Sequence, residues 1–308
     1  MELIRGLHNL RERHRGCVLT IGNFDGVHRA HQALIARTRE YGRRLGLPVA
    51  CFTFNPTARE FFDRANAPPR ISTLRSKVHA LETAGVDRLL IARFHQGLAT
   101  IGAEAFVTEL LVKGLGVRAV VVGDDARFGS RRQGNFDLLQ KLGKQYGYES
   151  ERLPAIEIGG ERCSSSSVRE ALGQADLARA EALLGRPYTV RGRVRRGLQL
   201  GRKLDMPTAN IPLPRHRLAL RQGIYAVLAT CEGRTFRGVA NLGVRPTLGL
   251  TQCLLETHVF EPPGDLYGRV LDVEFRAFLR PELKFDSLDA LKKQMHDDAA
   301  QAAAVLAA

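Results

Sequence analysis

Short apolar runs alternate with helical patterns through the first half of the chain. Val18–Ile21 and Val49–Phe54 are continuous β-rich runs typical of buried strands, and apolar positions recur at helical spacing between His31 and Leu45. The same alternation continues, with strands expected at Leu89–Ile91 and Ala119–Val122 and helices around Leu74–Leu81 and Phe106–Leu111. Strands and helices in alternation predict a parallel sheet with helices on both faces.

The pattern changes after about Gly185. Five short β runs follow, separated by Gly and Pro rather than by helical stretches: Tyr188–Val194, Ile224–Thr230, Thr235–Ala240, Leu254–Phe260 and Val270–Phe278. Such strands predict an antiparallel barrel or sandwich. A last helix is expected from Ser287, a good N-cap, and the alanine-rich tail Ala299–Ala308 either extends it or frays. We therefore predict an α/β chain of two domains, residues 1–184 and 185–308.

Composition narrows the class of protein. The chain has 308 residues, of which 44% are apolar and 25% charged, so each half can bury a core of its own. Its five cysteines form no CxxC pair, which predicts reduced thiols rather than a zinc site or a redox pair. The chain start Met1–Arg5 lacks the apolar core expected of a signal peptide, and no apolar run approaches the roughly 20 residues of a membrane span. We expect a cytoplasmic protein without a membrane partner.

The net charge of +14 has two interpretations. One is a nucleic-acid-binding protein, and the other is an enzyme that handles polyphosphates. The arginines are dispersed, with only short pairs such as Arg43-Arg44, and no aromatic-rich RNA-binding pattern accompanies them. We therefore expect no nucleic-acid partner.

The loop that begins at Gly22 is the first candidate for chemistry. It follows the strand Val18–Ile21 and precedes a helix, whose N-terminal N–H groups can bind phosphate. His28 and His31 are three residues apart and share one face of that helix, so both can stabilise charge on a phosphoryl group. Spacing alone favours the simpler interpretation of two surface histidines at a helix start.

Two further segments carry oxygen-rich side chains. Ser164–Ser167 can cap a helix and offer hydroxyls to ATP phosphates, with Arg169 as a fork donor for pyrophosphate, although a serine run alone is typical of a linker. Thr208 and Asn210 follow Pro207 and are neutral oxygen ligands that Mg²⁺ accepts beside phosphates. A turn with a capping Asn is an equally good explanation of this spacing.

The string Gly22-Asn23-Phe24-Asp25-Gly26-Val27-His28-Arg29-Ala30-His31 resembles the GxFDGxHxGH motif of nucleotidyltransferases related to class I aminoacyl-tRNA synthetases. Over nearly its full length the chain resembles the bifunctional bacterial riboflavin kinase/FMN adenylyltransferases. Four more segments carry this resemblance: Pro69–Lys77, Gly123–Gly129, Cys163–Arg169, which matches ISSTxIR, and Gly201–Ile211, which matches GRxLGxPTANI. The resemblance implies an N-terminal Rossmann-like domain and a C-terminal β-barrel with a terminal helix.

It also implies the activity. Riboflavin would be phosphorylated by ATP to FMN, and FMN would be adenylylated by a second ATP to FAD and pyrophosphate. His28 and His31 would be catalytic in adenylyl transfer, and Glu256 would be the general base of the kinase, although an exposed strand carboxylate is the common alternative. The implied ATP-binding residues are Gly22, Asn23, Phe24, Asp25, Asp125, Ser165, Ser166, Arg169, Gly201 and Arg202. The implied flavin-binding residues are Arg70 and Asn241, and the Mg²⁺ ligands are Thr208 and Asn210.

Some positions depart from the family pattern. Ala30 and Asp205 stand where the family has Gly, Thr57 replaces a histidine, and Ala126 replaces an aromatic residue. Asp205 would repel ATP unless Arg202 or Lys203 pairs with it. Two alternatives therefore stay open: a nucleotidyltransferase with a single activity, and a flavin-binding regulator of the same fold that has lost one half-reaction. Weak self-association is a further open point.

Overall fold

The computed structural model describes residues 1–197, 205–213, 218–247, 250–261 and 264–307. By packing, the chain divides into two compact units. The first unit comprises Met1–Pro68 and Val78–Cys163, and the second comprises Pro69–Lys77 and Ser164–Ala308. Helix α3 (Leu74–Thr83) contains the boundary at Lys77. The strand pattern changes after residue 184, whereas packing groups the two preceding helices with the strands that follow them.

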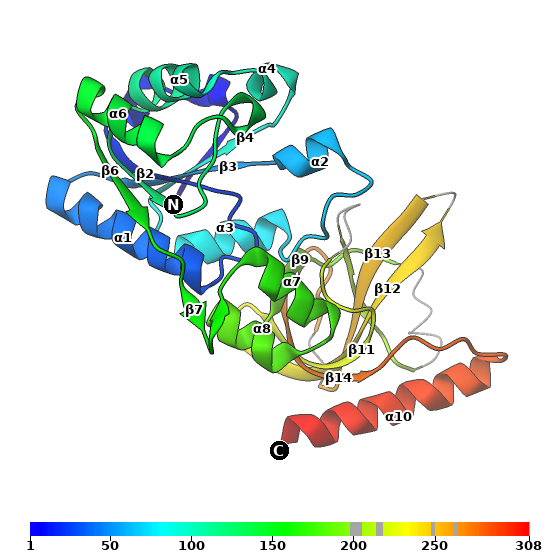
Figure 1. Ribbon diagram of the computed structural model, residues 1–308. Helices are drawn as coiled ribbons and strands as arrows, with labels where there is room; N and C mark the ends of the chain where they lie inside the picture. The colour runs from blue at the N-terminus through cyan, green and yellow to red at the C-terminus, as the bar shows by residue number, and fades with distance from the viewer. Residues whose placement is uncertain (198–204, 214–217, 248–249, 262–263, 308) are drawn as a thin grey trace. The chain divides into compact units, whose positions relative to one another are not determined.

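The first unit is built on a six-stranded sheet, seen in Figure 1, in which every strand pair is parallel, as predicted. The order is β1-β4-β3-β2-β5-β6. The strands are β1 (Glu2–Arg5), β2 (Cys17–Ile21), β3 (Val49–Phe54), β4 (Arg88–Ala92), β5 (Val117–Gly123) and β6 (Glu149–Leu153). A hairpin of β7 (Glu157–Ile158) and β8 (Glu161–Arg162) follows.

Helices cover both faces of this sheet. Helix α1 (Arg29–Leu45) packs on β2, β3 and β5, while α5 (Ala103–Ala105) and α6 (Phe136–Tyr146) lie on the opposite face (Figure 1). The segment Phe106–Gly114 continues α5 as a π-helix. The shorter elements are α2 (Ala58–Phe62), α4 (Gln96–Ala99) and the 3-10 turns Leu7–Asn9, Glu12–His14 and Ser130–Arg132.

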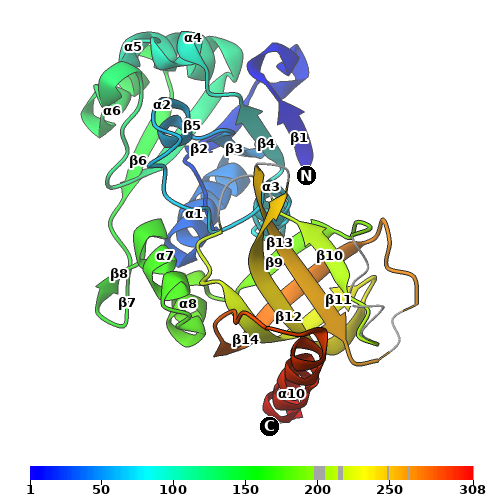
Figure 2. The same cartoon turned by 90° about the vertical axis from the view of Figure 1, so that its right-hand side faces the viewer.

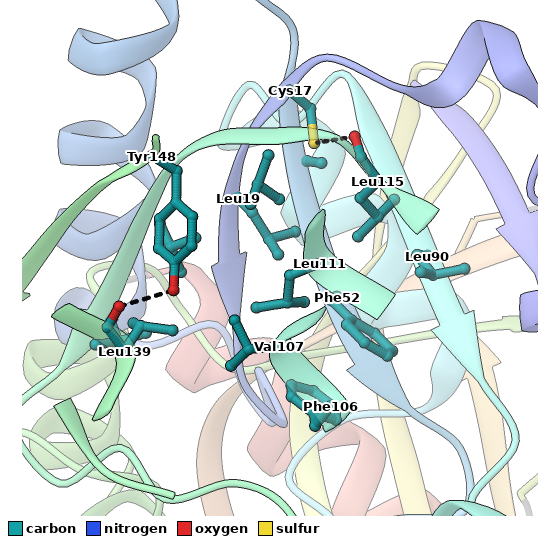
Figure 3. Packing of buried hydrophobic residues seen from close by; sticks show 14 of the residues in the cluster. Cys17, Leu19, Phe52, Leu90, Phe106, Val107, Leu111, Leu115, Leu139 and Tyr148 are labelled. Atoms are coloured by element: carbon teal, nitrogen blue, oxygen red, sulfur yellow. Dashed lines mark hydrogen bonds between the residues drawn. The ribbon is translucent and has the colours of Figure 1, made fainter. Parts of the chain in front are cut away.

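The core between the sheet and the π-helix is apolar and close-packed. Leu19 and Phe52 from the strands meet Phe106 and Leu111 from the π-helix, and Leu19, Phe52 and Leu111 are fully buried (Figure 3). The rings of Phe52 and Phe106 stack with centroids 5.9 Å apart. Burying a side chain of this size contributes about 1.5–3 kcal/mol, so this layer holds the strand ends that precede the functional loops.

The strand order predicts where on the sheet a ligand site would lie. Strand β3 lies on one side of β2, and β5, which comes later in the chain, lies on the other side of β2. Ligands of such sheets bind beyond the carboxyl ends of the strands, where the order reverses. Strand β2 ends just before Gly22 and β5 ends at Gly123, the first residues of two predicted nucleotide loops.

The second unit is a six-stranded antiparallel sheet with the order β10-β13-β12-β11-β14-β9. The two edge strands, β9 and β10, approach each other. The evidence is a hydrogen bond in which the N–H of Arg195, just after β9, donates to the carbonyl of Asn210 on β10 at 2.8 Å. The sheet is therefore a nearly closed barrel, which confirms the predicted architecture. The strands are β9 (Thr189–Arg193), β10 (Ala209–Pro212), β11 (Gly223–Cys231), β12 (Arg234–Thr247), β13 (Leu250–Val259) and β14 (Val270–Arg280).

Three helices and one distant segment pack with the barrel. They are α7 (Ser165–Gly173), α8 (Leu177–Leu184), α10 (Leu288–Ala307) and Pro69–Lys77. Helix α10 lies along the outside of β11, β12 and β14 (Figure 2). Ser287 caps it by accepting the N–H of Ala290 at 3.1 Å, and the alanine-rich tail extends it. Among the described residues, no helix is long and apolar enough to cross a membrane.

Candidate functional sites

The loop after β2 is held in place by buried backbone and side chains. The N–H of Gly22 donates to the carbonyl of Phe52 at 3.1 Å, and Thr53 Oγ1 donates to the carbonyl of Asn23 at 3.2 Å. Gly26 has φ +82°, a left-handed conformation that favours glycine. Phe24 is fully buried, and Asp25 is 6% exposed. The buried loop therefore presents a fixed backbone at the carboxyl edge of the sheet.

The structure brings the two predicted catalytic histidines together. His28 is the N-cap of α1 and His31 lies in its first turn, so their rings stack with centroids 3.7 Å apart and planes at 22°. The ring of Phe24 packs on His31 at 5.1 Å. His28 is only 4% exposed. This is the shared helix face that the spacing predicted, at a helix N-terminus suited to phosphate.

Asp125 lies at the same edge of the sheet. It follows β5, which pairs with β2 through Thr20 and Val121. Arg162 of β8 contacts this loop, with its Nη2 at 2.8 Å from Asp124 Oδ1 and at 3.9 Å from Asp125 Oδ2. The Asp125 side chain is 82% exposed. In this loop, the carboxylate of Asp124 is therefore held by Arg162, whereas the carboxylate of Asp125 is exposed to solvent.

Two of the departures from the family pattern have structural roles. Thr57 caps α2: its Oγ1 accepts the N–H of Glu60 at 3.3 Å, and its own N–H donates to Glu60 Oε2 at 2.8 Å. Ala126 packs against the core of the first unit. In this chain, position 57 therefore caps a helix and position 126 packs against the core.

Four residues predicted to serve adenylyl transfer belong to the second unit: Arg70, Ser165, Ser166 and Arg169. Ser164 caps α7 by accepting the N–H of Ser167 at 3.2 Å, as expected for the serine run. Arg169 Nε donates to the carbonyl of Pro69 at 2.7 Å, and the Arg70 carbonyl accepts the N–H of Ala219 at 2.8 Å. These bonds place Arg169 beside the segment that carries Arg70.

The predicted kinase residues form a row across three neighbouring strands. Glu256 on β13 is paired in register with Asn210 on β10 and with Asn241 on β12. Side chains at one register position point to the same face of a sheet. The flanking residues Leu255 and Thr257 are buried, at 0% and 1% exposure, whereas Glu256 is half-buried. Glu256 and Asn241 therefore lie on the outer face of the barrel wall, whereas Asn210 in the same row is only 6% exposed.

Thr208 lies next to this row. Asn210 Nδ2 donates to the carbonyl of Thr208 at 3.1 Å and lies 3.4 Å from its Oγ1. Among the described residues, no three His, Cys, Asp or Glu side chains are grouped to hold a metal. Two neutral oxygens beside one carboxylate fit Mg²⁺ that arrives with ATP, since such ions keep phosphate and water ligands. Gly201, Arg202 and Lys203 lie outside the described residues.

Asp205 is paired by a residue that the sequence did not suggest. Its Oδ2 lies 2.7 Å from Lys292 Nζ on α10, and this hydrogen bond lowers the pKa of the carboxyl below its ordinary value. The next residue, Met206, is buried in a cluster with Ala302 of the same helix. The last helix therefore anchors the segment before Thr208.

A second unexpected contact involves a cysteine. All five cysteines are buried thiols, and Cys163 Sγ lies 3.7 Å from His28 Nδ1. The two residues are 135 positions apart. Their separation along the sequence did not indicate that the two side chains would be in contact.

Comparisons with known proteins cover both units. The FAD synthetase family model matches residues 10–167, and the riboflavin kinase family model matches residues 184–306. The chain is 48% identical to a bifunctional riboflavin kinase/FMN adenylyltransferase of Pseudomonas fluorescens, over 100% of this chain and 98% of the relative. It is 46% identical to the protein of the same description from Escherichia coli K12, over 97% and 96%. A crystal structure from Streptococcus pneumoniae, described as a macrolide-efflux protein, is similar in fold, with a TM-score of 0.78, 26% identity and 97% of each chain covered.

Proposed function

The chain belongs to the family of bifunctional riboflavin kinase/FMN adenylyltransferases, and from this premise we propose which residues carry each reaction. It makes FMN from riboflavin and FAD from FMN. The observation that carries this function is the match of relatives along the whole chain, with a separate family model on each part. We assign FMN adenylylation to residues 1–184 and riboflavin phosphorylation to residues 185–308.

In the kinase reaction, Glu256 acts as the general base. It takes the proton from the 5′-hydroxyl of riboflavin while that oxygen bonds to the γ-phosphorus of ATP and the bond from γ-phosphorus to ADP breaks. The register supports this role, because Glu256 stands between two amides, those of Asn210 and Asn241. Asn241 would bind the flavin from its own strand.

Thr208 and Asn210 would hold Mg²⁺ together with the ATP phosphates. When bound, the ion neutralises charge on the transferred phosphoryl group. The chain's own contribution is orientation: the hydrogen bonds from Asn210 Nδ2 tie that side chain to Thr208. Gly201 and Arg202 are assigned to ATP on the motif alone.

In adenylyl transfer, a phosphate oxygen of FMN bonds to the α-phosphorus of ATP and pyrophosphate leaves. His28 and His31 donate hydrogen bonds to the charge that develops on the α-phosphoryl oxygens, and the N-terminus of α1 adds its partial positive charge. The stacking of the two imidazoles, with buried Phe24 packed on His31, supports this role. The residues Gly22, Asn23, Asp25 and Asp125 are assigned to ATP at the edge where β2 and β5 end.

The remaining assignments rest on the motif resemblance. Arg70 is assigned to the phosphate of the flavin, and Ser165, Ser166 and Arg169 are assigned to ATP and leaving pyrophosphate. The serine cap and the Arg169 contact to Pro69 support ordered side chains at these positions.

The function is tested by following flavins over time. The full chain is incubated with riboflavin and Mg-ATP, and riboflavin, FMN and FAD are separated by chromatography. We expect FMN to appear first and FAD to follow as FMN is consumed. Formation of FMN without FAD would confine activity to the kinase, and formation of neither flavin would contradict the proposal.

A further inference from the structure

A buried cysteine lies against the first histidine of the adenylyl-transfer loop. Cys163 directly follows β8 and is 4% exposed, as is His28, and Cys163 Sγ lies 3.7 Å from His28 Nδ1. The cysteine is fixed from its backbone as well, since its N–H donates to the carbonyl of Ile156 at 2.7 Å. The contact is thus a defined pair inside the first unit.

The sulfur carries its proton at neutral pH. Burial, the largest effect, raises the pKa of the Cys163 thiol. The backbone N–H groups of Ala30 and Arg29 and the charge of Arg29 act in the opposite direction, whereas Glu161 raises the pKa further. A buried thiol of this kind is an unreactive, weak S–H donor.

The direction of the hydrogen bond is inferred from the chemistry of the two groups. A protonated thiol has a single hydrogen to donate, and His28 Nδ1, 3.7 Å from the sulfur, is a ring nitrogen that can accept it.

We propose that Cys163 is a positioning residue for adenylyl transfer, whose S–H bond to Nδ1 keeps the proton of neutral His28 on Nε2. A neutral imidazole that accepts at one nitrogen donates from the other, so this contact fixes which nitrogen faces the phosphate. Stacking on His31 at 3.7 Å holds the plane of the ring. The inference rests on the role proposed above for His28.

The tautomer can be observed directly. Long-range ¹H–¹⁵N spectra of the full chain with ¹⁵N-labelled imidazoles distinguish the two tautomers, and the signals of His28 are assigned with His28→Ala. We expect the Nε2–H tautomer in the wild type and a mixture in Cys163→Val, which fills the volume without a donor. An Nδ1–H tautomer in the wild type, or an unchanged tautomer in Cys163→Val, would overturn the proposal.

Kinetics supply the second test. With FMN and Mg-ATP, we expect Cys163→Ala and Cys163→Val to lower kcat for FAD formation about fivefold, the effect of one hydrogen bond, with nearly unchanged KM values. Cys163→Ser, which keeps a donor, should restore kcat to within about twofold. The unchanged KM values for FMN and ATP report that the first unit is folded, FMN formation from riboflavin reports the same for the second unit, and Cys51→Ala is a matched buried-thiol control.

The outcomes separate two failures. If Cys163→Val equals the wild type, or if serine rescues no better than alanine, Cys163 only packs and the inference is wrong. If His28→Ala itself leaves FAD formation unchanged, the role proposed for His28 is wrong instead.

Discussion

Asp205 shows how a charge in one segment can be neutralised by a residue far along the chain. The residue has φ +60°, a conformation that glycine adopts freely, and its carboxylate was expected to repel ATP unless Arg202 or Lys203 neutralised it. In the structure, Lys292 pairs with it from 87 positions along the chain. A separation of this size leaves no trace in local sequence, because only the packing of α10 on the barrel brings the two charges together.

We predict that the pair of Asp205 and Lys292 holds the segment before Thr208 in position at neutral pH. Asp205→Asn and Lys292→Met should each raise KM for ATP in FMN formation about threefold, and the double variant should be no worse. Lys292 lowers the pKa of Asp205 in the folded chain. The contribution of the pair is therefore present at pH values above the pKa of Asp205 in the unfolded chain, and it is lost as pH falls through the pKa of Asp205 in the folded chain. The exposed neighbour Lys293 supplies the control variant Lys293→Met. Additive effects in steady-state kinetics would contradict the coupling.

At the level of elements, the hydrophobic pattern decided most of the fold. Strand β3 has the predicted bounds Val49–Phe54, since a continuous apolar run can only be a buried central strand in this context. Strand β6 (Glu149–Leu153) is polar and lies at the sheet edge, so it shows no periodic signal and was not predicted. Strand β10 was predicted as loop for a similar reason: it is a short edge strand that ends in a proline.

Helix α10 offers a stability prediction. Asp298 is 4% exposed and accepts two bonds from Arg280 of β14, at 2.7 and 2.6 Å, and a third from Gln294. Removing one partner of a buried pair leaves the other charge unsatisfied, at a cost of about 3 kcal/mol. Asp298→Ala should therefore lower the urea midpoint at which kinase activity is lost. Asp297→Ala, on the exposed face of the same helix, should not, and equal midpoints for the two variants would refute this role.

For the whole molecule, the sequence predicted two architectures in order, a parallel sheet and then an antiparallel barrel, and both are present. It could not predict that Pro69–Lys77 and the helices α7 and α8 pack with the barrel. That grouping depends on single long-range bonds, such as Tyr188 Oη donating to the carbonyl of Ile71 at 2.7 Å. The candidate sites were recognised from motifs, whereas the row of Asn210, Glu256 and Asn241 became visible only in the strand register.

The central claim is that separate residues carry the two reactions, and complementary variants test it most directly. Each variant is given riboflavin with Mg-ATP and, separately, FMN with Mg-ATP. We predict that Glu256→Gln abolishes FMN formation but still makes FAD from FMN, and that His31→Ala makes FMN but little FAD. Glu274→Gln, the same change on β14, should retain both activities. Loss of both reactions in either folded variant would contradict the account.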